Sequence, residues 1–67
     1  MKEDIERQIS NIIHIAMQES LQVARWKLFN KEHGTNHYDS LINFTQKYID
    51  DLEIHIQRLI NELKTSS

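Results

Sequence analysis

The segment QKYIDDLEIHIQRLI, residues 46–60, contains side chains whose types and spacing could do chemistry. Three acids lie within four positions, Asp50, Asp51 and Glu53. On a helix Gln46 lies one turn before Asp50, so the two side chains share a face. Asp50 could then orient or deprotonate a water molecule as a general base, with Gln46 hydrogen-bonding the same water. The alternative interpretation is that the acids are only the solvated side of an amphipathic helix.

The residues around this segment predict two long helices that must position it. In the first, the apolar positions recur at steps of three and four. They are Ile5, Ile9, Ile12, Ile13, Ala16, Met17, Leu21, Ala24 and Leu28. In the second, a heptad-like line consists of Ile42, Thr45, Ile49, Leu52, Ile56, Leu59 and Leu63. We therefore expect helices over about 3–33 and 37–64, with the second presenting a coiled-coil-like seam.

Gly34 is the only glycine, and it marks the turn between the two helices. Glycine readily takes the left-handed conformation that closes a helix. Asn36 is expected to cap the second helix, with Asp39 in the position of a capping-box acid. A turn of about three residues, 34–36, makes the helices antiparallel neighbours, with residue i near residue 70 − i. The predicted fold is an all-α, antiparallel two-helix hairpin, a single domain over residues 1–67.

Apolar residues outside the two lines indicate a further interface. They are Ile15, Val23, Trp26 and Phe29 in the first helix and Leu41, Phe44, Tyr48, Ile54 and Ile60 in the second. A single small core supplies only roughly 3–5 kcal/mol, so oligomerisation is the expected reinforcement. One explanation is a homodimer that forms a four-helix bundle. The other is a docking face for a different protein, with Trp26, Phe44 and Ile54 as exposed anchors.

The composition argues against several classes of function. The chain has no cysteine, so it has neither a disulfide nor a thiolate metal site. Its 8 basic residues against 10 acidic ones form no basic stripe of the kind that binds nucleic acid. The apolar runs are short, so no membrane span is expected. We expect a cytoplasmic protein with neither nucleic acid nor membrane as a partner.

Residues 46–58 resemble a signature of the small two-helix aspartyl-phosphate phosphatases of endospore-forming bacteria. That signature is S-Q-x-L-D, followed in many members by x-L-I-x-x-Y-Q-R. The residues that align with it are Gln46, Lys47, Tyr48, Ile49, Asp50, Leu52, Gln57 and Arg58. Upstream, this chain also resembles the family's first helix and turn, at Glu19, Leu21, Arg25, Leu28 and Gly34. The sequence departs from the pattern at Gln46 and Lys47, where the family has Ser and Gln, and at Ile56, where it has Tyr.

The resemblance implies a negative regulator of sporulation that docks on a phosphorylated response regulator and removes its aspartyl phosphate. Asp50 and Gln46 would be catalytic. The predicted partner-binding residues are Lys47, Asp51, Arg25 and Trp26. The protein would need no cofactor of its own, because the partner would supply the divalent metal. The alternative function is a non-catalytic helical-hairpin homodimer that binds and blocks, or scaffolds, another protein.

The histidines are the remaining candidates. His33 and His37 are four residues apart, but the turn lies between them, so we do not expect a shared helix face or a metal site. The register places residue 14 opposite residue 56. His14 and His55 are therefore expected to approach each other partly out of water, either as interfacial side chains or as a pH-sensitive contact.

Overall fold

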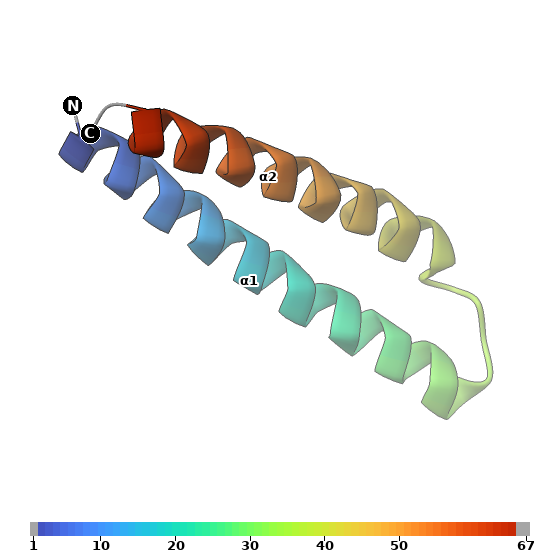
Figure 1. Cartoon of the computed structure of the whole chain (residues 1–67). Coiled ribbons are helices and arrows are strands. Elements are labelled where there is room, and N and C mark those ends of the chain that lie inside the picture. The colour runs from blue at the N-terminus through green and yellow to red at the C-terminus, as the bar shows by residue number, and fades with distance from the viewer. Residues whose placement is uncertain (1, 66–67) are drawn as a thin grey trace.

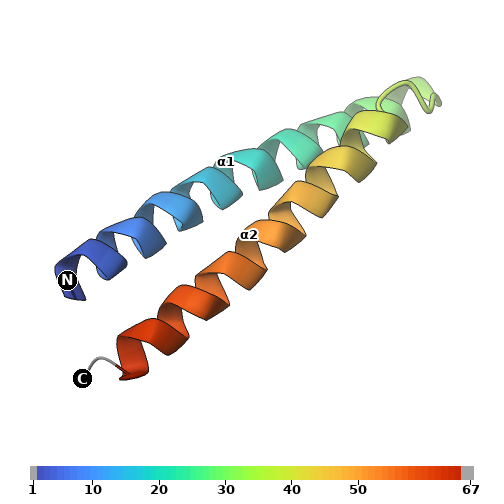
Figure 2. The same ribbon diagram turned by 90° about the horizontal axis from the view of Figure 1, so that it is seen from above.

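A computed structural model describes residues 2–65 and shows two long helices packed against each other (Figure 1). The first helix, α1, spans Lys2–His33, and the second, α2, spans Asp39–Thr65. Both views show the start of α1 and the end of α2 at the same end of an antiparallel pair (Figures 1 and 2). The Cα atoms extend over 51 × 15 × 11 Å, so the pair of helices forms a single thin layer. The predicted all-α hairpin is confirmed.

Charged residues at the two ends of α1 favour a helix of this length. Glu3 and Asp4 lie in its first turn, and Lys31 and His33 lie in its last. Acids near the N-terminus and bases near the C-terminus stabilise a helix through its macrodipole. In the part of the chain that the structure describes, neither helix is apolar over a stretch long enough to cross a membrane.

The turn begins with a helix ending that the single glycine makes possible. Gly34 has φ 57°, in the left-handed region that L-residues with a side chain rarely occupy. The Thr35 N–H donates to the Asn30 carbonyl at 3.0 Å. This bond, from the residue after the left-handed position back to the last turn, is the mark of a Schellman motif. Gly34 therefore ends α1 as predicted.

The start of α2 differs from the prediction. The connection covers residues 34–38, because α2 begins at Asp39 rather than at about residue 37. The polar partner at this end is Asn30 of α1, whose Oδ1 accepts from the Tyr38 N–H at 3.2 Å and whose Nδ2 donates to Asp39 Oδ1 at 3.0 Å. Asn36 contributes only its backbone carbonyl, which accepts from the Asp39 N–H at 3.0 Å. The predicted side-chain cap at Asn36 is wrong because the chain folds back close enough for α1 to supply the cap.

The side of α2 that packs against α1 is the predicted seam. Thr45, Ile49 and Leu59 are buried. The remaining members are half-buried, and they are Ile42, Leu52, Ile56 and Leu63. Every predicted position therefore lies against α1 or at the edge of the contact, including Thr45, the one polar member.

The buried stripe of α1 departs from the prediction after Ala16. The residues on it are Ile5, Ile9, Ile12, Ala16, Glu19, Val23, Trp26 and Asn30. Met17 and Leu21, predicted to lie on the stripe, are 62% and 60% exposed. Ile13, Ala24 and Leu28 are exposed as well. Consecutive residues of a helix are about 100° apart, so Met17 lies on a different side of α1 from Ala16. The buried positions continue instead at steps of three and four residues, through Glu19 and on to Asn30.

The displaced apolar residues of α1 lie beside the seam and line a groove. Its lining residues are Ile13, Ala16, Met17, Ser20 and Leu21 from α1, with Ile49, Glu53 and Ile56 from α2. Residues that the predicted register places opposite each other (i and 70 − i), such as Met17 and Glu53, line the same stretch of this groove. The predicted register between the helices therefore holds, although the helix face that α1 was expected to bury does not.

Candidate functional site

Gln46 and Asp50 come together on α2 as the sequence predicted. The Gln46 Nε2 donates to Asp50 Oδ1 at 3.3 Å, and both side chains are exposed. The four-residue spacing sets one above the other on a continuous helix, so the backbone fixes their relative position. The hydrogen bond uses one oxygen of the carboxylate. The other oxygen and the Gln46 carbonyl remain on a surface that a water molecule or a partner's group can reach.

A line of side chains on α2 points away from α1. Its members are Phe44, Lys47, Asp51, Ile54 and Arg58, spaced by three and four residues. We call this the α2 outer line. Phe44 is 75% exposed and Ile54 is 54% exposed. Two large apolar side chains so open to water are typical of an interaction surface. Both residues were predicted as possible anchors but were not grouped with Lys47 and Asp51, although the spacing of all four opposite the seam was the sequence signal for this surface.

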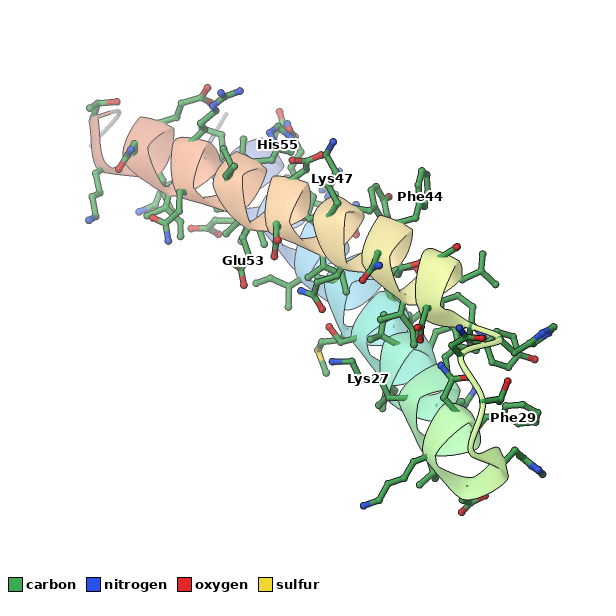
Figure 3. All side chains as sticks on the ribbon, turned by 90° about the vertical axis from the view of Figure 1, so that its right-hand side faces the viewer. Lys27, Phe29, Phe44, Lys47, Glu53 and His55 are labelled. Carbon is green, nitrogen blue, oxygen red and sulfur yellow. The ribbon has the colours of Figure 1, made fainter. Side chains whose placement is uncertain are left out.

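The three acids of the opening segment separate onto different sides of α2. Asp51 lies with Phe44, Lys47 and Tyr48 around a shallow hollow. Glu53 borders the groove instead. Phe44 and Lys47 project on one side of α2 and Glu53 on the opposite side, with Lys27 of α1 on the side of Glu53 (Figure 3). The acids therefore do not form one cluster, because consecutive residues of a helix are about 100° apart.

The two predicted partner-binding residues of α1 lie in different environments. Arg25 is exposed. Trp26 is half-buried on the stripe that faces α2, and its ring stacks on Tyr38 with centroids 5.8 Å apart and planes 18° apart. The indole therefore helps to close the hairpin near the turn. Arg25 is the more accessible of the two to another protein.

Aromatic rings gather at the turn end of the hairpin. Phe29 contacts the Tyr38 ring edge-on, with centroids 5.1 Å apart. His33 and His37 lie near the same phenyl ring, at centroid distances of 4.2 and 6.5 Å. Both imidazoles are exposed. Ring packing in this cluster helps to hold the connection in its conformation, with both histidines next to Phe29.

His14 and His55 do not lie in the seam. Both are exposed, and the nearest polar partner of His14 is Gln18, with His14 Nε2 and Gln18 Nε2 3.1 Å apart. The prediction that the two imidazoles are partly out of water is wrong. It relied on the register alone, whereas His14 lies away from the side of α1 that packs on α2 and His55 lies outside the seam of α2.

The chemistry open to these side chains is limited by the shape of the molecule. Within residues 2–65, no three His, Cys, Asp or Glu side chains are placed so that they could hold a metal ion. The Gln46–Asp50 pair lies on an exposed helix face, so any reaction there needs a second molecule to enclose it. The pair can accept a proton and orient a water, and the α2 outer line beside it can supply contacts.

Comparison with known proteins finds no match among protein families, curated proteins or solved structures.

Proposed function

We propose that this protein is a regulatory hairpin that docks on a phosphorylated response regulator through α2 and removes its aspartyl phosphate, as in negative control of sporulation. The observation that carries the proposal is the arrangement of α2. The exposed Phe44 and Ile54 bracket Lys47 and Asp51 along the α2 outer line, and Asp50 is adjacent. From Phe44 to Ile54 the line is about 15 Å long, at a rise of 1.5 Å per residue.

The docking contacts follow from the side chains of the α2 outer line. Phe44 and Ile54 would enter apolar hollows on the partner, where large desolvated side chains contribute most of the binding energy. Lys47 and Asp51 would form the polar contacts between them. Arg25 would add a contact only if the partner also reaches α1, since it belongs to the other helix.

The reaction proposed at the docked face is hydrolysis of an acyl phosphate. The Asp50 carboxylate accepts a proton from a water molecule as the water oxygen bonds to phosphorus. The bond between phosphorus and the partner's aspartate oxygen breaks, which restores the partner's carboxylate and releases inorganic phosphate. Gln46, held against Asp50 at 3.3 Å, positions the carboxylate and the water. A divalent metal bound by the partner would neutralise charge on the phosphoryl oxygens.

The second candidate function is binding without catalysis. It is favoured by the open position of Gln46 and Asp50 on a helix face and by the extent of the exposed apolar surface on both helices. Here the hairpin would pair as a homodimer of four helices and block or scaffold another protein. A homodimer is compatible with both candidates, because the exposed apolar residues of α1 are separate from the α2 outer line.

A phosphate-release assay distinguishes the two candidates. Purified response regulators are phosphorylated with a small phosphodonor, freed of the donor, and followed for phosphate loss with and without the hairpin. The first candidate predicts faster loss from at least one regulator at substoichiometric hairpin. The second predicts that binding to a regulator, measured by fluorescence anisotropy, leaves the rate unchanged. If all regulators lose phosphate at their intrinsic rates and none binds, neither candidate holds for this class of partner.

A further inference from the structure

Exposed residues of α1 form a second line, on the side of the helix that borders the groove. It comprises positions 3, 6, 10, 13, 17, 21, 24, 28 and 31, again at steps of three and four, and all nine are exposed. We call this the α1 line. Its central part contains Ile13, Met17, Leu21 and Leu28, each more than two-fifths exposed. Contiguous apolar surface of this kind marks an interaction site.

The spacing of the α1 line is the same in both directions from Met17. Two antiparallel copies therefore match residue i with residue 34 − i, and Met17 meets the Met17 of the second copy. Ile13 then faces Leu21, Ser10 faces Ala24, and Glu6 faces the apolar Leu28. The Ser10 and Ala24 side chains are small, so the two helices can approach closely there. A two-fold symmetric contact requires a surface that is complementary to itself in this way.

The charges at the ends of the α1 line also favour an antiparallel pair of α1 helices. Glu3 and Glu6 lie at its start and Lys31 at its end, with Lys27 beside it. An antiparallel pair places Glu3 opposite Lys31 of the second copy, at both ends of the contact. A parallel pair would instead set acids against acids and lysines against lysines, which repel.

The α2 outer line offers a shorter contact to a second copy. Phe44, Lys47, Asp51 and Ile54 are spaced by three, four and three residues, so two antiparallel copies would set Phe44 against Ile54 and Lys47 against Asp51. The α1 line matches over all nine positions and brings Ile13, Met17 and Leu21 together at its centre. It therefore covers more exposed apolar surface in a pair of copies than the α2 outer line does.

We infer that the α1 line binds a second copy of this chain in antiparallel orientation, with Met17 on the two-fold axis. The inference rests on the homodimer in the proposed function and specifies its face and direction. Ile13, Met17 and Leu21 of each α1 cover those of the other, and Glu53 of α2, which borders the groove, lies near the edge of the contact. The α2 outer line stays free to dock, because it lies on the other helix and points away from α1.

Cysteine cross-linking tests this arrangement, since the natural chain contains no cysteine. Under mild oxidation Met17→Cys is expected to form a covalent dimer, because a residue on the axis lies near its own counterpart. Gln18→Cys, at the same level of α1 on another side, is the matched control and is expected to remain uncoupled. Glu3→Cys and Lys31→Cys are expected to cross-link when mixed but not separately. A parallel dimer would give the opposite pattern for these last two variants.

Sedimentation equilibrium distinguishes a dimer that uses another interface from a protein that does not dimerise. Met17→Lys places two charges together on the axis and removes two apolar side chains, so we expect the dimer Kd to rise about 100-fold or more. Helix content at low protein concentration is expected to remain unchanged, since Met17 is exposed within one chain. A dimer that survives both Met17→Lys and Leu21→Lys overturns the α1 line as the interface and leaves the homodimer intact. A wild type that is monomeric at all concentrations overturns both, whatever its effect on a response regulator.

Discussion

Two single variants, Leu59→Ala in α2 and Leu21→Ala in α1, together test which side of α1 is buried. Leu59 of α2 is 5% exposed, whereas Leu21 of α1 is 60% exposed. The change removes the same atoms and has the same effect on helix propensity at both sites, so the two variants differ only in environment. Deleting three buried carbons at about 0.8 kcal/mol each, with a small cavity, predicts a loss of about 2.5 kcal/mol for Leu59→Ala. The exposed Leu21 retains about two-fifths of that burial, which predicts a loss of about 1 kcal/mol.

The measurement is urea denaturation followed by circular dichroism, at a protein concentration where sedimentation shows monomer. The expected difference between the two variants is about 1.5 kcal/mol in the free energy of unfolding. Equal losses would show that Leu21 belongs to the seam, as the sequence alone suggested, and would refute the stripe through Val23 and Trp26. Raising the protein concentration is expected to increase the cost of Leu21→Ala but not that of Leu59→Ala, because Leu21 is also in the proposed dimer contact.

Three further substitutions test the turn and the docking surface. Asn30→Ala removes the side chain that joins both helices and is expected to cost about 1–2 kcal/mol of unfolding free energy in denaturant titration, whereas Asn36→Ala is expected to cost little. Equal effects would reject Asn30 as the cap. Gly34→Ala forces a side chain into a left-handed conformation at φ 57° and should lower stability by about 1 kcal/mol, and a neutral result would show that the turn adopts another conformation. Phe44→Ala should change the melting temperature little, because Phe44 is exposed, yet weaken regulator binding in fluorescence anisotropy at least tenfold. Undiminished affinity would remove Phe44 from the docking surface.

The sequence was sufficient to predict the hairpin, the α2 seam and the helix ending at Gly34. In α2 one face from Ile42 to Leu63 is apolar at every position except Thr45, so periodicity alone identifies the buried side. Gly34 is the only residue in the chain without a side-chain penalty for the left-handed turn. Local rules decide each of these features, and they agree with the packing between the helices.

The buried stripe of α1 could not be predicted in the same way. Two sets of positions follow one another at helical spacing, and the more apolar one leads through Met17 and Leu21. The structure buries the set that contains Glu19 and Asn30, where Val23 is 4% exposed and Trp26 stacks on Tyr38. Which set faces α2 depends on the pairing with Tyr38 and Asp39 across the turn, and this contact is not a property of the α1 sequence alone.

The candidate site was predicted as a pair of residues, whereas the surface beside it was not assembled from the sequence. The spacing of Gln46 and Asp50 determined their contact, because a helix fixes neighbours four residues apart. Lys47 and Asp51 belong to the α2 outer line with Phe44 and Ile54, and their spacing opposite the predicted seam was the sequence signal for this grouping. The register alone does not bring His14 and His55 into the seam, because neither belongs to the buried side of its own helix.

The most direct test of the central claim is the rate of phosphate loss from a phosphorylated response regulator in the presence of Asp50→Ala. Glu62→Ala, which removes another exposed carboxylate of α2, is the matched control. Removing a general base is expected to slow the reaction about 100-fold or more, while the control retains the wild-type rate. Binding of both variants to the regulator should remain close to wild type, because the anchors on the α2 outer line are unchanged. Phosphate loss with Asp50→Ala as fast as with wild type would contradict the catalytic role of Asp50.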